Sequence, residues 1–219
     1  MCGIYGFSTN YPRNEKVEIL KQMGKAIKHR GPDQSGLYFD DNIAIGIERL
    51  SILDLKKGHQ PIFSNDGNFV IIHNGEIYNY KEIRKGLQKD GYYFKTNTDT
   101  EVIVNLFQQK GLSCLNELNG MFVFAIYDIG KQTLIIVRDR FGIKPLYYTS
   151  KYDSFIFGSE LKAYRPHITL GRFKDKDRPQ YEFGIFEEPL KGKAKQLDVF
   201  ESEFDKGKTE YTLIKSVEF

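Results

Sequence analysis

The order of the predicted secondary-structure elements most restricts the fold of this chain. The first half of the chain begins with β-prone apolar runs. Two consecutive helical segments come after these runs, and further β-prone runs follow the helical segments. A parallel sheet needs strands and helices in regular alternation, which this order does not provide. We therefore predict an α+β fold of two sheets with helices packed outside. The predicted strands are residues 2–8, 36–39, 43–47, 69–73, 121–128, 133–138, 146–149 and 155–158, and the predicted helices are residues 17–28, 80–89 and 99–110.

The chain changes character after residue 163. Lys, Asp, Glu and Gly become frequent, Pro166, Pro179 and Pro189 interrupt the pattern, and the helical periodicity of apolar residues ends. A length of 219 residues suffices for one domain with a well-formed core, or for one domain and a fragment. We therefore predict a domain over residues 1–163 and a β-rich fragment over residues 164–219.

Charge balance and cysteine content narrow the range of partners and compartments. The 32 basic and 29 acidic residues leave a net charge of +3, which favours neither nucleic acid nor an anionic membrane as a partner. No apolar stretch is long enough to span a bilayer, and no signal-peptide pattern opens the chain. The two cysteines, Cys2 and Cys114, do not suggest a disulfide framework. These features predict a cytoplasmic protein.

Cys2 stands directly after Met1, and a small residue at this position favours removal of Met1 by methionine aminopeptidase. The processed chain would begin with a thiol beside a free α-amine. An α-amine has an ordinary pKa of about 7.7–8.0, so a neutral fraction can take the proton of a thiol whose pKa is about 8.5. This is the N-terminal variant of a nucleophile and its base. The alternative is that Cys2 is a small buried residue of the first strand.

Asn74-Gly75-Glu76 follows the apolar run 69–73, and a strand end with a glycine suits a catalytic loop. An Asn side-chain amide and a Gly backbone N–H can both donate to a tetrahedral oxyanion, and one such donor contributes roughly 3–4 kcal/mol. The alternative is a simple turn, because Asn-Gly is the commonest short hairpin signal.

Arg49 and Asp99 carry charges that are complementary to those of a free amino acid such as glutamine. A bidentate Arg suits an α-carboxylate, and an acidic side chain suits an ammonium group. For Arg49 the alternative is a surface ion pair. For Asp99 the alternative is a structural role, because Thr98 to Glu101 reads as a capping box at a helix start.

Seven short motifs occur in a fixed order within residues 1–163. They are Cys2-Gly3-Ile4, His29-Arg30-Gly31-Pro32-Asp33, Arg49-Leu50-Ser51-Ile52, Gln60-Pro61, Asn74-Gly75-Glu76, Thr98-Asp99 and Arg138-Asp139-Arg140-Phe141-Gly142-Ile143-Lys144-Pro145-Leu146-Tyr147. In this order and spacing they resemble the class II glutamine amidotransferase domain of glutamine-hydrolysing asparagine synthetases. Seven motifs in order are highly specific, so the resemblance favours the catalytic interpretations over the structural ones.

This resemblance implies an N-terminal nucleophile hydrolase fold, which is an αββα sandwich. It implies that Cys2 attacks the side-chain amide of glutamine while Asn74 and Gly75 hold the oxyanion, with no metal and no cofactor. The resemblance also implies which residues bind glutamine. These are Arg49, Leu50, Ser51, Ile52, Leu53, Asn74, Gly75, Glu76 and Asp99.

The resemblance further implies a partner domain. Asparagine synthetases activate aspartate with ATP and Mg²⁺ in a second domain, whose Ser-Gly-Gly-x-Asp-type loop does not occur in this sequence. The amidotransferase domain of that family also normally continues past residue 163, so we expect it to be truncated here. The expected partners are a separate synthetase domain or a second copy of the chain, and we expect the run 138–147 to pack against the synthetase half.

Residues 165–172, 197–202 and 209–217 resemble the C-terminal part of 2′-5′ RNA ligase-like proteins of the 2H phosphoesterase family. That family needs two His-x-Thr motifs, because one His takes a proton and the other gives one. Only the motif of His167 and Thr169 is present. The sequence therefore predicts a fusion of two unrelated parts, from an artificial, rearranged or misassembled gene, with a natural fusion as the alternative. The alternatives to a glutaminase are a catalytically silent glutamine-binding or regulatory module, and an RNA 2′,3′-cyclic phosphodiesterase that uses His167.

Overall fold

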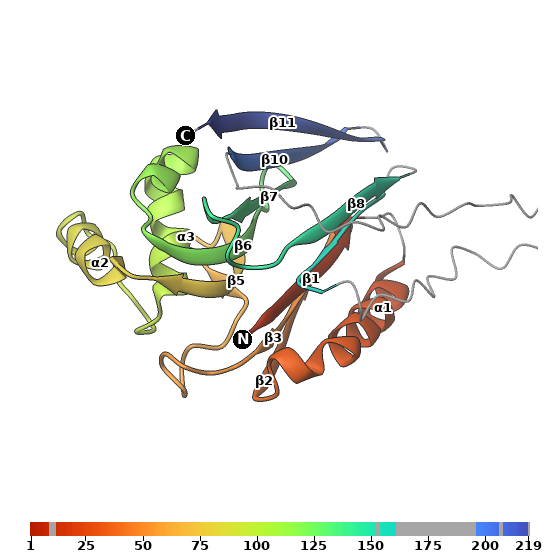
Figure 1. The fold of residues 1–219 in the computed structure, drawn as a ribbon, viewed down its shortest axis with the longest axis horizontal. Helices are drawn as coiled ribbons and strands as arrows, with labels where there is room; N and C mark the ends of the chain where they lie inside the picture. The colour runs from red at the N-terminus through yellow and green to blue at the C-terminus, as the bar shows by residue number, and fades with distance from the viewer. Residues whose placement is uncertain (9–11, 152–153, 161–195, 206–207, 219) are drawn as a thin grey trace, which may run out of the picture.

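A computed structural model describes residues 1–8, 12–151, 154–160, 196–205 and 208–218. Two antiparallel sheets, sheet A and sheet B, are stacked face to face, and helices lie on the outer side of each (Figure 1). The layer order is helix, sheet, sheet, helix. The predicted α+β sandwich is therefore confirmed.

Sheet A has the strand order β2-β3-β1-β9-β8. Its strands are β1 (Gly3–Ser8), β2 (Gln34–Phe39), β3 (Ile43–Arg49), β8 (Tyr147–Lys151) and β9 (Ser154–Gly158), and helix α1 (Arg13–Ala26), followed by the 3₁₀ turn η1 (Lys28–Arg30), packs on its outer face. The β1–β3 register places Gly3 opposite Glu48. Because the strands are antiparallel, Cys2 lies next to the segment that follows Arg49.

Sheet B has the strand order β11-β10-β7-β6-β5-β4. Its strands are β4 (Ile62–Phe63), β5 (Phe69–Ile77), β6 (Gly120–Asp128), β7 (Thr133–Arg138), β10 (Gln196–Asp205) and β11 (Lys208–Glu218). The helices α2 (Tyr80–Lys89) and α3 (Asp99–Lys110) and the 3₁₀ turn η2 (Gly111–Asn116) belong to its outer layer. The chain leaves β5 for these helices and returns through β6, so the start of α3 lies beside the end of β5.

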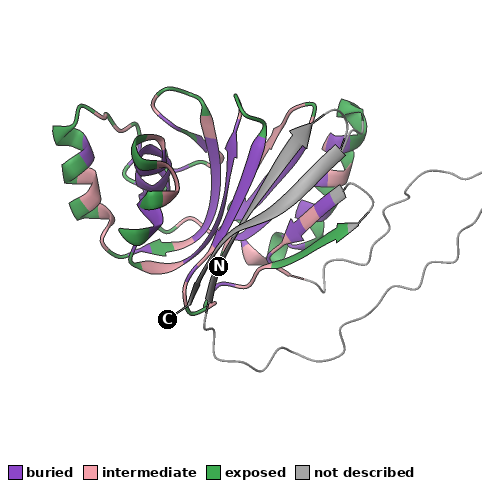
Figure 2. Cartoon of the chain, turned by 90° about the horizontal axis from the view of Figure 1, so that it is seen from above, coloured by how far each residue is buried: buried purple, intermediate pink, exposed green. Residues whose placement is uncertain are grey.

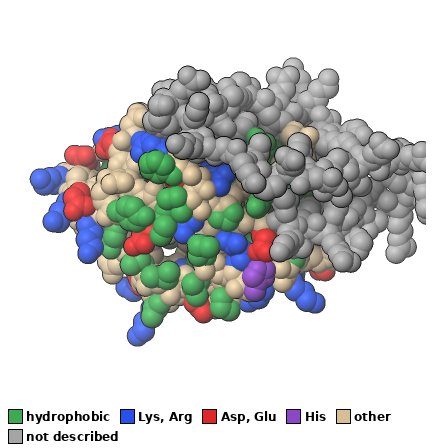
Figure 3. Space-filling view, in the orientation of Figure 1, with side chains coloured by type: hydrophobic (Ala, Val, Ile, Leu, Met, Phe, Trp, Pro, Cys, Tyr) green, Lys and Arg blue, Asp and Glu red, His purple; other side chains and the backbone are tan. Residues whose placement is uncertain are grey.

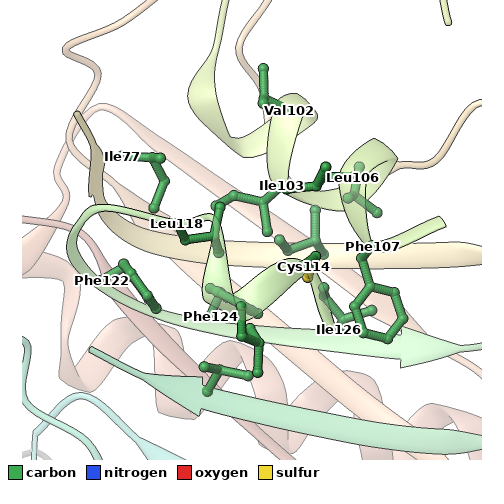
Figure 4. Close-up of a cluster of buried hydrophobic side chains, with 14 of the residues drawn as sticks. Ile77, Val102, Ile103, Leu106, Phe107, Cys114, Leu118, Phe122, Phe124 and Ile126 are labelled. Carbon is green, nitrogen blue, oxygen red and sulfur yellow. The ribbon is translucent and has the colours of Figure 1, made fainter. Parts of the chain in front are cut away.

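The hydrophobic core follows the alternation of side chains along the strands. In β5, Val70 and Ile72 point between the sheets, whereas Ile71 and Ile77 point toward α3. Figure 4 shows the second group, in which Ile103 and Leu106 of α3 meet strands β5 and β6. Buried residues accordingly gather in the facing sheets and in α3, while the outer sides of α1 and α2 are exposed (Figure 2). The two facing sheets thus form a rigid base for the loops at their edge.

The sequence predicted most elements near their observed bounds. The helices at 80–89 and 99–110 and the strand at 133–138 match their predicted ranges. The first helix instead covers Arg13–Ala26, because residues 28–30 turn into a 3₁₀ helix after the C-cap at Ile27. Strand β4 was not predicted, since two residues are too few to show a period.

Strand β5 differs from the prediction in a way that matters for the site. It runs to Ile77, so Asn74, Gly75 and Glu76 lie inside the strand and neither in a catalytic loop nor in a turn. Asn74 is paired with Val123 of β6, and the ladder continues to Ile77. A nine-residue pairing with β6 outweighs the local turn preference of Asn-Gly.

Two strands that follow residue 163 extend sheet B. The ladder between β10 and β7 runs from Val199 opposite Val137 to Ser202 opposite Leu134, and β10 continues into a hairpin with β11. Whether strands of this segment could join the sandwich was left open by the sequence, and they do. The division of the chain into domains at residue 163 stays a prediction.

The start of α3 keeps half of the predicted capping box. Thr98 Oγ1 accepts a hydrogen bond from Glu101 N at 3.3 Å. The Glu101 carboxylate instead accepts from the backbone N–H groups of Lys95 and Thr96. It therefore holds the loop before the helix.

Replacing Thr98 by Val should lower the free energy of unfolding by about 1 kcal/mol, because the helix loses its N-cap acceptor. The measurement is the urea midpoint at unchanged m-value. Thr149→Val, which makes the same change at an exposed position of β8, is the control. Equal effects of the two substitutions would argue against a capping role of Thr98.

Candidate functional site

A cavity of about 450 Å³ opens where the two sheets and the start of α3 meet. It is lined by Met1, Cys2, Arg49, Leu50, Ile52, Leu53, Gln60, His73, Asn74, Gly75, Glu76, Thr98, Asp99, Thr100, Met121, Ile143 and Lys144. The site residues predicted within residues 1–163 are therefore brought together, with the exception of Ser51. That residue lies behind the cavity and accepts a hydrogen bond from Arg49 through its hydroxyl group.

Cys2 is half-buried and lies directly before the first residue of β1. Its Sγ is 3.4 Å from Leu50 N and 3.5 Å from Leu50 O, so the thiol can both accept from and donate to one peptide group. Burial raises the pKa of the thiol, while the Leu50 N–H, the α-amine of Met1 and Arg49 each lower it in part. The thiol is therefore protonated at rest, and a base is needed to make it a nucleophile.

Asn74 and Gly75 present hydrogen-bond donors from β5. Asn74 is 1 % exposed, and its Nδ2 has no hydrogen-bond partner among the described residues. A buried amide without a partner is costly unless a ligand satisfies it. Gly75 lies so close to β6 that an added Cβ would be 2.3 Å from Met121 O, so only glycine fits at this position.

Arg49 closes the cavity at the end of β3. Its guanidinium donates to the side chains of Gln34 and Ser51 and to the carbonyl of Leu53, and these acceptors are all uncharged. No carboxylate of the described residues lies within 4.0 Å of this group. A buried cation without an ion-pair partner is suited to an anionic ligand.

Asp99 is the first residue of α3 and is buried. Its Oδ2 accepts from Ile77 N at 3.0 Å and its Oδ1 from Thr100 N at 2.9 Å, so two backbone groups orient the carboxylate. Glu76 is exposed at the cavity rim. The cavity lining thus carries two acidic side chains besides Arg49, and these can accept from an ammonium group.

The sequence assigned no role to His73, which lies beside Asp99. Its Nδ1 is 3.1 Å from Thr100 Oγ1 and 3.9 Å from Asp99 Oδ1. Gln60 pairs with the backbone of His73 through both ends of its side-chain amide. The Gln60-Pro61 motif was a signal for this contact, but nothing in the local sequence links His73 to α3.

The run 138–147 forms a tight loop that delivers Ile143 and Lys144 to the cavity. The Asp139 carboxylate accepts four backbone N–H groups at 3.0–3.3 Å, namely those of Phe122, Phe141, Ile143 and Lys144. Buried Lys144 lies 3.4 Å through its Nζ from Met1 Sδ. The motif therefore has a structural role within this chain. Its packing against a synthetase half stays a prediction.

Exposed apolar side chains occur in the two segments that deliver residues to the cavity, 50–53 and 138–147. Ile52, Phe141 and Ile143 are all more than half exposed. Figure 3 shows hydrophobic side chains gathered on the described part of the face that Figure 1 presents.

The predicted tail site cannot be placed, and neither a metal site nor a membrane span was predicted. His167 and Thr169 fall outside the described residues, so the prediction for them is not tested. Within 1–8, 12–151, 154–160, 196–205 and 208–218, no cluster of three or more His, Cys, Asp or Glu side chains is arranged for a metal ion. In the same ranges, no helix has the length and apolar character needed to cross a bilayer.

The sequence matches a known protein family. The family model of the glutamine amidotransferase domain matches residues 1–183. Asparagine synthetase 2 (glutamine-hydrolysing) of Bacillus subtilis is 45 % identical over 170 residues, which cover 76 % of this chain and 22 % of that protein. Asparagine synthetase B (glutamine-hydrolysing) of Escherichia coli is 41 % identical over 170 residues, which cover 76 % of this chain and 30 % of that protein. The chain thus spans less than a third of the length of these curated relatives.

A solved structure shares the fold at low identity. The glutamine phosphoribosylpyrophosphate amidotransferase of B. subtilis superposes with a TM-score of 0.70 at 18 % identity, covering 99 % of this chain and 50 % of that one. This likeness confirms the predicted sandwich of the N-terminal nucleophile type. Since the family model also spans most of the sequence, the chain belongs to the glutamine amidotransferase domain family.

Proposed function

We propose that this chain hydrolyses glutamine to glutamate and ammonia, with Cys2 as the nucleophile. One observation carries the proposal: Cys2 lines the same cavity as Asn74, whose Nδ2 has no hydrogen-bond partner among the described residues. A nucleophile and a free donor in one site are what acyl transfer requires. The family and its glutamine-hydrolysing relatives name the substrate class.

The reaction begins once Met1 has been removed. The neutral α-amine of Cys2 takes the thiol proton, and Sγ forms a bond to the side-chain carbonyl carbon of glutamine. The carbonyl oxygen becomes an oxyanion, which accepts from Asn74 Nδ2 and Gly75 N–H. The carbon–nitrogen bond then breaks, and the nitrogen leaves as ammonia with the proton held by the amine.

Water completes the cycle. The same amine takes a proton from water, whose oxygen attacks the thioester carbon. A second oxyanion forms at the same donors and collapses as the carbon–sulfur bond breaks. The thiolate recovers its proton, and glutamate leaves.

The substrate's amino-acid end would lie between Arg49 and the two acidic side chains of the cavity lining. Arg49 would bind the α-carboxylate, and Asp99 with Glu76 would accept from the ammonium group. The segment Leu50, Ser51, Ile52 and Leu53 would shape this end of the site, with Ser51 holding the Arg49 guanidinium.

Arg49→Met should raise the KM for glutamine by about tenfold to a hundredfold with a smaller change in kcat, because a charged hydrogen bond of the ground state is lost. Steady-state kinetics of glutamate formation give both constants. Arg84→Met is the matched control, since Arg84 contacts Thr96 and Phe94 outside the cavity. A fall in kcat at unchanged KM would contradict this role of Arg49.

The direct test of the function is covalent labelling by 6-diazo-5-oxo-norleucine, a glutamine analogue with an electrophilic carbon. Intact mass should show loss of Met1 and one adduct, and peptide mapping should place it on Cys2. Cys114 is an internal control, because burial raises the pKa of its thiol to about 12. Retention of Met1, or labelling at Cys114, would refute the mechanism.

Partners and compartment follow as part of the proposal. We infer that ammonia passes to a synthetase domain, where ATP and Mg²⁺ would act, and that glutamine hydrolysis itself uses no cofactor. A cytoplasmic location fits that role.

Labelling without turnover would favour the alternative of a silent glutamine-binding module. Turnover of a 2′,3′-cyclic nucleotide that is lost in His167→Ala would be needed to support a phosphodiesterase.

A further inference from the structure

His73 lies on the helix side of β5, opposite to the face that carries Asn74. Alternation along the strand places it with Ile71, and its ring stands edge-on to Phe124. It is 2 % exposed, and its Nε2 has no hydrogen-bond partner among the residues that the structure describes. The imidazole is thus enclosed in the wall of the cavity.

One face of this imidazole meets the start of α3. Nδ1 is 3.1 Å from Thr100 Oγ1 and 3.9 Å from Asp99 Oδ1. The second distance is within reach of an ion pair if the ring carries a positive charge. The Asp99 carboxylate is the group that the proposed function assigns to the ammonium of glutamine.

The surroundings of His73 decide its charge. Burial lowers the pKa of the imidazole, Asp99 of α3 raises it, and Lys144 from the loop before β8 lowers it. Among the residues that the structure describes, these two are the charged groups that act on the ring from the elements packed against it. The imidazole is therefore neutral near pH 7 and takes a proton only in acid.

We propose that His73 is a further positioning residue of the glutamine site, whose neutral imidazole leaves the Asp99 carboxylate free for the substrate's ammonium and whose protonated form pairs with that carboxylate. The inference rests on the proposed function, because it assumes that Asp99 receives the ammonium. The inference predicts that glutamine binding depends on pH through the protonation of His73.

The test is the dissociation constant of L-glutamine, measured by calorimetry on the Cys2→Ala protein, which binds without turnover. Between about pH 7.5 and pH 5, the dissociation constant should rise by about tenfold for each pH unit below the pKa of His73, since only the unprotonated form binds. His73→Asn keeps a polar group next to Thr100 but cannot take up a proton. Whatever its value near pH 7.5, the dissociation constant of this variant should stay flat in acid.

A ligand without the ammonium group is the matched control. 4-Carbamoylbutanoate has the amide and the carboxylate of glutamine but makes no use of Asp99, so its weaker binding should not depend on pH in this range. Circular dichroism at each pH verifies that both variants remain folded.

The outcomes are separable. A flat glutamine profile in the parent, or an equal acid rise in His73→Asn, overturns the role of His73 while the glutamine site stands. No glutamine binding at any pH refutes the site and the inference together. Acid weakening of both ligands shows that another group titrates, and this also overturns the proposal.

Discussion

Cys2→Ala is expected to abolish ammonia release from glutamine while glutamine binding persists. The substitution removes the atom that forms the thioester, so the acyl-enzyme route is closed and at least about 10³-fold in kcat should be lost. The backbone contacts of the segment around Leu50 do not depend on the thiol, and alanine at position 2 still permits removal of Met1. Glutamate formation under saturating glutamine is the measurement.

Cys114→Ala is the paired control for this result. Cys114 is fully buried between α3 and sheet B, remote from the cavity lining. Its removal should cost stability through a small void but leave the rate per folded molecule unchanged. If Cys2→Ala retained turnover, or if Cys114→Ala lost it, Cys2 would not be the nucleophile.

Asn74→Ala should lower kcat by about 10²–10³-fold with little change in KM, because one of the two oxyanion donors is lost. The donor makes its strongest hydrogen bond in the transition state, so the ground-state complex is less affected. Asn74→Asp should be at least as damaging, since a carboxylate would repel the oxyanion. Single-turnover kinetics separate the chemical step from binding.

Asn105 offers an unusually close control. Its Nδ2 is also buried without a described partner, but it lies on α3 outside the cavity. Asn105→Ala thus removes the same chemical group from a comparable environment and should alter stability alone. A loss of kcat equal to that of Asn74→Ala would mean that the effect comes from loosened packing and not from the oxyanion.

The sequence predicted the helices at 80–89 and 99–110 well because their signals are local. The Tyr80–Lys89 helix carries an apolar stripe, and Thr98 provides a cap at the start of α3. Asn74-Gly75 misled because its turn preference is also local, whereas the ladder with β6 that overrides it joins residues far apart in the sequence.

The site residues were predicted from the set of ordered motifs and the family that it resembles. No pattern in the sequence shows which of these residues meet in space. Nothing in the spacing of Arg49 and Asp99 shows that the end of β3 and the start of α3 face one cavity. His73 was missed for the same reason, because its neighbours Thr100 and Asp99 lie on another element. Pairwise contacts across layers carry this information, and one sequence does not display them.

The pairing of β10 with β7 gives the C-terminal segment a protective function within the sheet. Without β10, the apolar residues 134–137 of β7 would form a bare margin whose backbone N–H and C=O groups could template the addition of a foreign strand. Shortened versions of this chain would therefore expose a self-association surface far from the cavity. If such a version lost activity, its oligomeric state would have to be measured before the loss is assigned to the site.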